Sequence, residues 1–212
     1  MLTDDFSQEA ALVHLRRDPI LAAVIDSCRP VQPRPHEDIY LALIKAIVSQ
    51  QISTKAAAAV WKKVEALFKP DGYPEPSVLV LMSDDELRAA GLSRQKAGYL
   101  RAIAEFSLQD KLEYSFIAGL NEEELTNHLT VIRGVGRWTA QMIQMFALDQ
   151  PDVFPEGDLG VQNAMRRMYQ LEETGRPLLR RITQIAEDWR PYRTLACKYL
   201  WQSLPTTPKP EE

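Results

Sequence analysis

The sequence predicts an all-α protein, for two reasons. Apolar residues recur three or four positions apart through most of the chain, which is the spacing of one face of a helix. No segment alternates polar and apolar residues for long enough to build a sheet. The 212 residues suffice for one or two domains with a buried core.

Capping residues and prolines place the helices of the first two thirds of the chain. Pro30–Pro35 is a connector, because proline lacks the N–H that a helix needs. Ser53, Ser93 and Asn121 precede helical patterns and are good N-caps, and Ser83 with Glu86 forms a capping box. The predicted helices cover residues 2–28 (as one or two helices), 38–48, 54–68, 83–90, 93–106 and 122–132.

A tight turn is predicted at Gly134-Val-Gly136, between the helical pattern that ends near Ile132 and one that continues through Phe146. Only Gly adopts a positive φ without a steric penalty, so two glycines one residue apart mark a change of direction. The first N–H groups of the second helix lack partners within the helix, and they can hold a phosphate there. Arg133 and Arg137 flank the turn. An ordinary corner between two helices would give the same pattern.

The last helices are predicted over residues 158–169, 176–188 and 192–201. Asp158 stands at the start of the first of them, where an Asp caps a helix well. The net charge is −4, which is unusual for a protein that binds phosphates. Residues 129–204 nevertheless hold 10 Lys and Arg against 8 Asp and Glu. The basic share of the chain therefore coincides with the glycine turn and Asp158.

Composition argues against several other classes of protein. There is no apolar run of about 18 residues, so no membrane span is expected. The acidic segment Met1–Phe6 lacks the basic start of a secretory signal. Cys28 and Cys197 are far apart and have no CxxC spacing, so we expect free thiols in a reducing compartment.

Five stretches, in the right order, resemble the helix-hairpin-helix DNA glycosylases. They are Ile47–Ser53, Gly91–Ala97, Leu129–Ala140, Asp152–Gly160 and Trp189–Trp201. The family that the chain resembles most is the alkyl-base class, DNA-3-methyladenine glycosylase II, in a short form without an N-terminal β domain. The resemblance implies the glycosylase fold, with two helical lobes and a cleft between them.

The same resemblance implies the division of the chain. Residues 1–35 together with 151–204 would form one lobe. Residues 36–150 would form the other, with the helix-hairpin-helix at 129–147 and a tail at 205–212.

The resemblance also implies the roles of individual residues. Asp158 would be the catalytic carboxylate, beside the sugar that becomes positive as the base leaves. Gly157 stands where close relatives carry a second Asp. The base pocket would be formed by Trp138, Met142 and Trp201, whose indole faces attract a cationic alkylated base by about 0.5–2 kcal/mol per contact. Core packing is the other interpretation of each Trp, as capping is of Asp158.

Contacts with DNA follow in the same way. Gln51 matches the side chain that wedges into the duplex, although many relatives have an apolar residue there and a solvated loop Gln is the plainer interpretation. The positions that contact the DNA backbone are Arg133, Gly134, Gly136, Arg137 and Thr139. The main-chain carbonyls of Thr130, Ile132 and Val135 match those that bind Na⁺ or K⁺.

Two further expectations concern chemistry. Trp138 stands where bifunctional relatives carry a Schiff-base lysine, so a monofunctional enzyme is implied. Some related glycosylases hold an iron–sulfur cluster with four cysteines, and two cysteines cannot supply one. No cofactor is therefore expected.

We therefore expect an enzyme that flips alkylated bases out of duplex DNA and hydrolyses them off, leaving an abasic site for base excision repair. It would act as a monomer, away from membranes, in the cytoplasm or nucleoid of a bacterium or the nucleus of a eukaryote. The alternatives are a glycosylase of the same fold for uracil, hypoxanthine or ethenoadenine, and a non-catalytic helix-hairpin-helix protein that binds DNA. An α-helical scaffold unrelated to DNA would show no salt-dependent affinity for it.

Overall fold

The computed structural model describes residues 8–32, 38–117 and 119–204, and these residues form helices and connecting turns without any strand. The predicted all-α class is confirmed. The start of the first predicted helix, the end of the proline connector and the tail 205–212 lie outside the described residues. None of the helices in the described ranges is long and apolar enough to cross a membrane.

The chain divides into two compact units, one discontinuous and one continuous in sequence. Met1–Arg34 and Asp149–Glu212 make up the first unit, and Pro35–Leu148 makes up the second. Helices from before and after the second unit therefore belong to the same unit, and the second unit is inserted between them.

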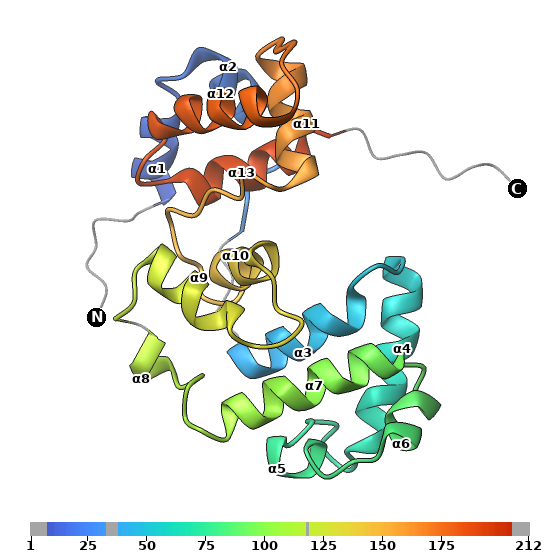
Figure 1. Ribbon diagram of the computed structural model, residues 1–212. Coiled ribbons are helices and arrows are strands. Elements are labelled where there is room, and N and C mark those ends of the chain that lie inside the picture. The colour runs from blue at the N-terminus through green and yellow to red at the C-terminus, as the bar shows by residue number, and fades with distance from the viewer. Residues whose placement is uncertain (1–7, 33–37, 118, 205–212) are drawn as a thin grey trace, which may run out of the picture. The chain divides into compact units, whose positions relative to one another are not determined.

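The first unit is built from helices of both ends of the chain (Figure 1). They are α1 (Gln8–Leu15), α2 (Pro19–Ser27), α11 (Leu159–Met168), α12 (Gly175–Glu187) and α13 (Arg193–Gln202). Helix α13 packs against both α2 and α11, and α12 packs against α11. The core of this unit thus needs segments that are more than 130 residues apart in sequence.

Asp18 joins the two ends of the chain within the first unit. Its side chain caps α2 by accepting hydrogen bonds from the N–H groups of Ile20 and Leu21. It also accepts from the hydroxyl of Tyr169 and, at 3.1 Å, from the indole Nε1 of the buried Trp189. One carboxylate therefore accepts hydrogen bonds from a helix end, from the half-buried Tyr169 and from the buried Trp189.

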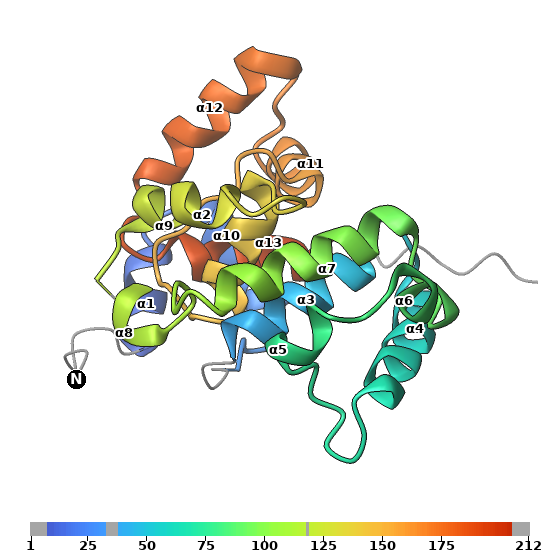
Figure 2. The ribbon, with the colours of Figure 1, turned by 60° about the horizontal axis from the view of Figure 1, so that its bottom comes forward.

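The second unit holds the remaining helices around one apolar core (Figure 2). They are α3 (Ile39–Ser49), α4 (Thr54–Leu67), α5 (Pro76–Leu79), α6 (Asp84–Ala89), α7 (Arg94–Ser107), α8 (Tyr114–Ile117), α9 (Glu122–Thr130) and α10 (Arg137–Phe146). Helix α7 packs along α3 and also contacts α5 and α6, while α10 packs against α3 and α9. Helices α3 and α7 are thus the elements on which the rest of this unit is assembled.

Local sequence explains most helix starts in this unit. The capping box of Ser83 and Glu86 is present in both directions, as predicted. Two one-turn helices, α5 and α8, were not predicted, because four residues are too few to show helical spacing. Helix α9 ends at Thr130 rather than at Ile132, because the N–H of Ile132 bonds to the carbonyl of Leu129 and tightens the last turn.

Candidate active site and DNA-binding hairpin

The helix-hairpin-helix consists of α9, the turn 131–136 and α10. Gly134 has a φ of +97°, as a turn glycine should. Gly136 does not: its φ is −90°, and it serves as the N-cap of α10. The expectation that both glycines supply a positive φ is therefore wrong for Gly136. Gly136 instead leaves the first N–H groups of α10 without a side-chain acceptor, because glycine has no side chain that could cap the helix.

Gly134 lies against the ring of Tyr99 on α7. A Cβ at this position would come within 2.3–2.8 Å of the ring atoms, which is closer than any real contact allows. The glycine therefore has two reasons to be there, its backbone conformation and its close approach to an aromatic face. The hydroxyl of Tyr99 is in turn held by Gln95 at 2.6 Å. This packing fixes the hairpin turn on α7.

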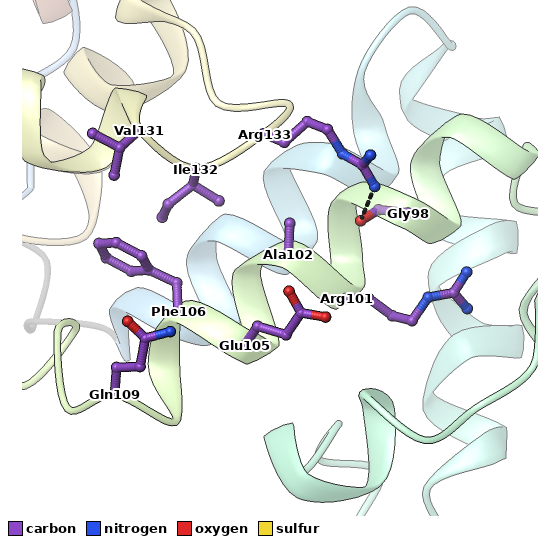
Figure 3. A pocket seen from close by; sticks show the side chains of 9 residues that line it. All are labelled: Gly98, Arg101, Ala102, Glu105, Phe106, Gln109, Val131, Ile132 and Arg133. Atoms are coloured by element: carbon purple, nitrogen blue, oxygen red, sulfur yellow. Dashed lines mark hydrogen bonds between the residues drawn. The ribbon is translucent and has the colours of Figure 1, made fainter.

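Both arginines beside the turn have partners within the second unit. Figure 3 shows Arg133 along a groove of about 410 Å³ between α7 and the turn, where its Nη2 donates to the carbonyl of Gly98 at 3.3 Å. Arg137 forms a two-pronged ion pair with Glu123 on α9, with N–O distances of 3.2 and 3.0 Å. This pair holds the pKa of Glu123 below its ordinary value. The charge of Arg137 is thus partly neutralised by the protein itself.

The other residues assigned to the hairpin differ in exposure. Trp138 has 48% of its surface exposed at the start of α10, and Met142 is half-buried one turn later. The side chain of Thr139 is buried, so a phosphate contact at this position would fall to its backbone. The carbonyls of Thr130, Ile132 and Val135 belong to the end of α9 and the turn, and that of Ile132 accepts from the N–H of Val135 at 3.0 Å. An ion bound there stays a prediction.

The loop between α3 and α4 carries Gln51, which is exposed and has a left-handed backbone with φ 58°. The preceding Gln50 is half-buried and donates from Nε2 to the carbonyl of Gly134 at 3.3 Å and to Oγ1 of Thr139 at 3.5 Å. The predicted wedge is therefore adjacent to a side chain that reaches the hairpin. Gln50 was not predicted as a site residue, because a polar residue at a helix end has no distinctive pattern.

Asp158, in the first unit, is the N-cap of α11. Its Oδ1 accepts the N–H of Val161 at 2.8 Å and the indole Nε1 of Trp201 at 2.8 Å. Trp201 comes from α13, so two helices fix this carboxylate. The capping interpretation of Asp158 is thus confirmed. The cap also fixes the orientation of the carboxylate, which is compatible with the predicted catalytic role. The hydrogen bond from Trp201 was not predicted.

Gly160 makes room for this hydrogen bond. A Cβ on Gly160 would lie 2.9 Å from Oδ1 of Asp158 and 2.9 Å from the indole of Trp201. Gly157, on the other side of Asp158, is exposed and has open space around it. The hydrogen bond between Asp158 and Trp201 therefore requires a small residue at position 160, whereas position 157 has room for a side chain.

The loop before Asp158 is anchored to the start of α13. Arg193 is buried, and it binds the carboxylate of Asp152 through Nε at 2.7 Å and Nη2 at 3.1 Å. Thr194 adds two bonds, because its Oγ1 accepts from the N–H of Val153 and donates to the carbonyl of Gln150. The loop is thereby held at one end by these contacts and at the other by the cap of α11.

Metal-binding residues are not gathered in the described part of the chain. No group of three or more His, Cys, Asp and Glu side chains there is placed to hold a metal ion. Cys28 and Cys197 do not form a disulfide. The chemistry available from the described residues is that of a fixed carboxylate, aromatic faces and backbone N–H donors.

Comparisons with known proteins agree with this arrangement. Residues 44–191 match the model of the HhH-GPD superfamily of base excision DNA repair proteins, so the chain belongs to that superfamily. DNA-3-methyladenine glycosylase 1 of Schizosaccharomyces pombe is 32% identical over 184 residues, which is 86% of this chain and 80% of the relative. The predicted alkyl-base glycosylase family is thereby confirmed.

Solved structures give the same result. A DNA-3-methyladenine glycosidase from Bacillus halodurans superposes with a TM-score of 0.80 at 33% identity, over 92% of this chain and 88% of the other. A 3-methyladenine DNA glycosylase of Schizosaccharomyces pombe, solved in complex with abasic DNA, superposes with a TM-score of 0.76 at 31% identity, over 90% and 94%. The predicted helix-hairpin-helix DNA glycosylase fold is therefore confirmed.

Proposed function

We propose that this protein is a monofunctional DNA glycosylase that removes alkylated bases, of the 3-methyladenine and 7-methylguanine type, from duplex DNA. The carboxylate of Asp158 carries this proposal, because two N–H donors hold it at the start of α11, at the position that the family resemblance assigns to catalysis. A fixed carboxylate needs no reorganisation when positive charge develops beside it, which is how such groups lower a barrier.

The reaction follows from the charges involved. Alkylation of a ring nitrogen makes the base cationic, so it leaves C1′ with the bonding electron pair and becomes neutral. The sugar takes on positive charge, which the carboxylate of Asp158 stabilises. Water then adds its oxygen to C1′, and its proton passes to the carboxylate and on to solvent. The product is an abasic site, and no second chemical step is required.

Several supporting groups act on binding rather than on the bond. The exposed ring of Trp138 would attract the cationic base, and an indole at that position cannot form the Schiff base of a strand-cutting enzyme. The N–H groups at the start of α10 would hold a phosphate of the duplex. We propose that the protein acts as a monomer on duplex DNA with a damaged base, in the compartment that holds the genome.

The decisive experiment compares base release from methylated duplex DNA by the native protein, Asp158→Asn and Asp188→Asn. Asn caps a helix as well as Asp does, so Asp158→Asn should fold and bind DNA normally. We expect base release to fall by at least about a hundredfold, as for loss of one preorganised group. Asp188→Asn removes the same charge from an exposed side chain at the end of α12 and should leave the rate unchanged.

Two outcomes would contradict the proposal in different ways. Equal release by the native protein and Asp158→Asn would remove the mechanism. Binding without release by either protein would indicate a non-catalytic DNA-binding protein. The same assay with deaminated and etheno-containing DNA, run side by side, tests the substrate class. Faster release of deaminated or etheno bases than of alkylated bases would make them the substrates of this enzyme.

A further inference from the structure

The backbone of Gln51 is held in a conformation that it would not adopt by itself. Its φ of 58° lies in the left-handed region, which is unfavourable for residues with a Cβ. Such residues persist where surrounding contacts impose the conformation, and they concentrate at functional sites. The contacts around this loop therefore identify what imposes it.

The first of these contacts comes from Lys96 on α7. Its Nζ donates to the carbonyl of Val48 at 2.8 Å and to the carbonyl of Gln50 at 2.7 Å. Helix α3 ends at Ser49, so Lys96 binds carbonyls at the negative end of the helix and just beyond it. An ammonium group thus fixes the backbone on the residue directly before Gln51.

The second contact comes from the side chain of Gln50. Its Nε2 donates to the carbonyl of Gly134 and to the buried hydroxyl of Thr139, so it reaches both the turn and the second helix of the hairpin. Its own carbonyl is one of the two that Lys96 binds. Gln50 therefore connects the Gln51 loop, α7 and the hairpin within one unit.

We propose that Lys96 and Gln50 are positioning residues that keep the Gln51 loop in register with the hairpin, so that a hairpin bound to a DNA phosphate places Gln51 in the base stack. This inference rests on the proposed function, because it assumes that Gln51 enters DNA. Neither residue touches the reacting atoms. Their effect is confined to the step in which the damaged base leaves the stack and its place is filled.

Burial lowers the pKa of Lys96, because the ammonium group is partly removed from water where it binds the two carbonyls. A lysine that served only as a surface charge would stay in water. This agrees with a specific role in the loop.

The test uses Lys96→Met, which keeps the apolar stem and removes the ammonium. The matched control is Lys63→Met, which removes the same charge from an exposed position on α4. Insertion of Gln51 is measured by the fluorescence of 2-aminopurine placed beside an abasic analogue in duplex DNA, at saturating protein. We expect Lys96→Met to lose most of the fluorescence change, and Lys63→Met to keep it.

A second readout separates positioning from general damage. Single-turnover release of 7-methylguanine is measured from a paired site and from a site opposite an abasic gap, where extrusion is easier because the base has no partner. We expect Lys96→Met to be about tenfold slower on the paired site, as for the loss of a hydrogen-bonded charge, and within about twofold of native on the unpaired one. Equal slowing on both sites would overturn the proposal, as would equal slowing by Lys63→Met.

Two more variants guard against a fold defect. Lys96→Arg keeps a cation that can bind carbonyls and should restore the fluorescence change. Gln50→Glu keeps the size and the main-chain carbonyl of Gln50 but replaces its N–H donor with oxygen, and it should reproduce the defect of Lys96→Met. A native fluorescence change in Gln50→Glu, or none in Lys96→Arg, would overturn the proposal.

Failure of the proposed enzyme activity would be distinguishable from failure of this inference. If native protein releases no base, the catalytic proposal fails, while the 2-aminopurine experiment on abasic DNA still reports on the loop. If native protein binds that DNA without any fluorescence change, the positioning proposal itself is wrong.

Discussion

The indole Nε1 of Trp201 donates a hydrogen bond of 2.8 Å to Oδ1 of Asp158, the same oxygen that caps helix α11. Family resemblance assigns Trp201 to the wall of the base pocket, where its ring face would be used. The structure adds a role for its edge. If the ring face contacts the base as the resemblance implies, Trp201 has two roles, and a substitution that keeps the ring but removes the N–H separates them.

Trp201→Phe should slow base release with little change in DNA affinity. Phe keeps an aromatic face but has no N–H, so the carboxylate of Asp158 loses one of its donors. A hydrogen bond to a charged group contributes about 1.5–3 kcal/mol, so we expect a rate lower by roughly ten- to a hundredfold. Single-turnover release and fluorescence anisotropy with abasic DNA measure the two quantities separately.

The control for Trp201→Phe is a double-mutant cycle. If the tryptophan acts through Asp158, Trp201→Phe should have no further effect on the rate in the Asp158→Asn background. Additive losses in the double variant would show that the indole acts on the base alone.

Gly160→Ala should disturb the same pair of residues. Its Cβ would lie 2.9 Å from both Asp158 and Trp201, so one of the two side chains has to move. We expect a loss of about 1–3 kcal/mol in the free energy of unfolding from overpacking, with slower base release. Gly157→Ala is the matched control in open space and should change stability by less than about 0.5 kcal/mol. Urea unfolding measures the stability of both variants. Equal losses in the free energy of unfolding for Gly160→Ala and Gly157→Ala would contradict the prediction.

Gly134→Ala should be far more damaging than Gly136→Ala, although the two glycines belong to one motif. At Gly134 a positive φ and the ring of Tyr99 both oppose a Cβ, so we expect a loss of about 2–4 kcal/mol. At Gly136 the φ is negative and the space is open, so only the poorer N-cap counts, at below about 1 kcal/mol. Denaturant melts with similar midpoints for the two variants would disprove this.

Glu123→Gln should strengthen DNA binding. Arg137 is paired with Glu123, and the substitution removes a negative charge from the first helix of the hairpin and weakens the hold of this pair on the guanidinium. The dependence of log affinity on log salt concentration should steepen by up to about one unit, the slope for one added phosphate contact. Anisotropy titrations over a range of salt concentrations measure both quantities.

The control is Glu173→Gln, which changes the net charge equally at an exposed position in the loop before α12. The pH dependence gives a second check. Arg137 holds the pKa of Glu123 below its ordinary value of 4.5, so the pair is intact at every pH above that value and is lost only as the pH falls through the lowered pKa. The advantage of Glu123→Gln should therefore be constant from pH 5 to pH 8 and disappear only in strong acid.

Sequence alone predicted the helical class and the longer helices well, because their signals are local. The caps at Ser53, Ser83, Ser93 and Asn121 are all present, since each cap and its helix lie within four residues of one another. The one-turn helices α5 and α8 were missed, because four residues are too few to show the spacing of apolar residues along a helix.

The site was predictable only as far as single motifs extend. Resemblance assigned Asp158, yet its bond to Trp201 joins residues 43 positions apart, and nothing in either motif indicates it. The same holds for Gln50 and Lys96, and for Glu123 as the partner of Arg137. Long-range pairs arise from packing, which a local pattern does not encode.

The division of the chain into a continuous unit and a split one has a consequence for synthesis on the ribosome. Helices α1 and α2 emerge from the exit tunnel first, but α13, against which α2 packs, is made last. The inserted segment Pro35–Leu148 can complete its core in the nascent chain. At that stage Asp18 still lacks its partners Trp189 and Tyr169, which have not yet been synthesised. A translational pause after Leu148 has left the exit tunnel should therefore yield a protease-resistant middle segment, while the segment that holds α1 and α2 is still cleaved.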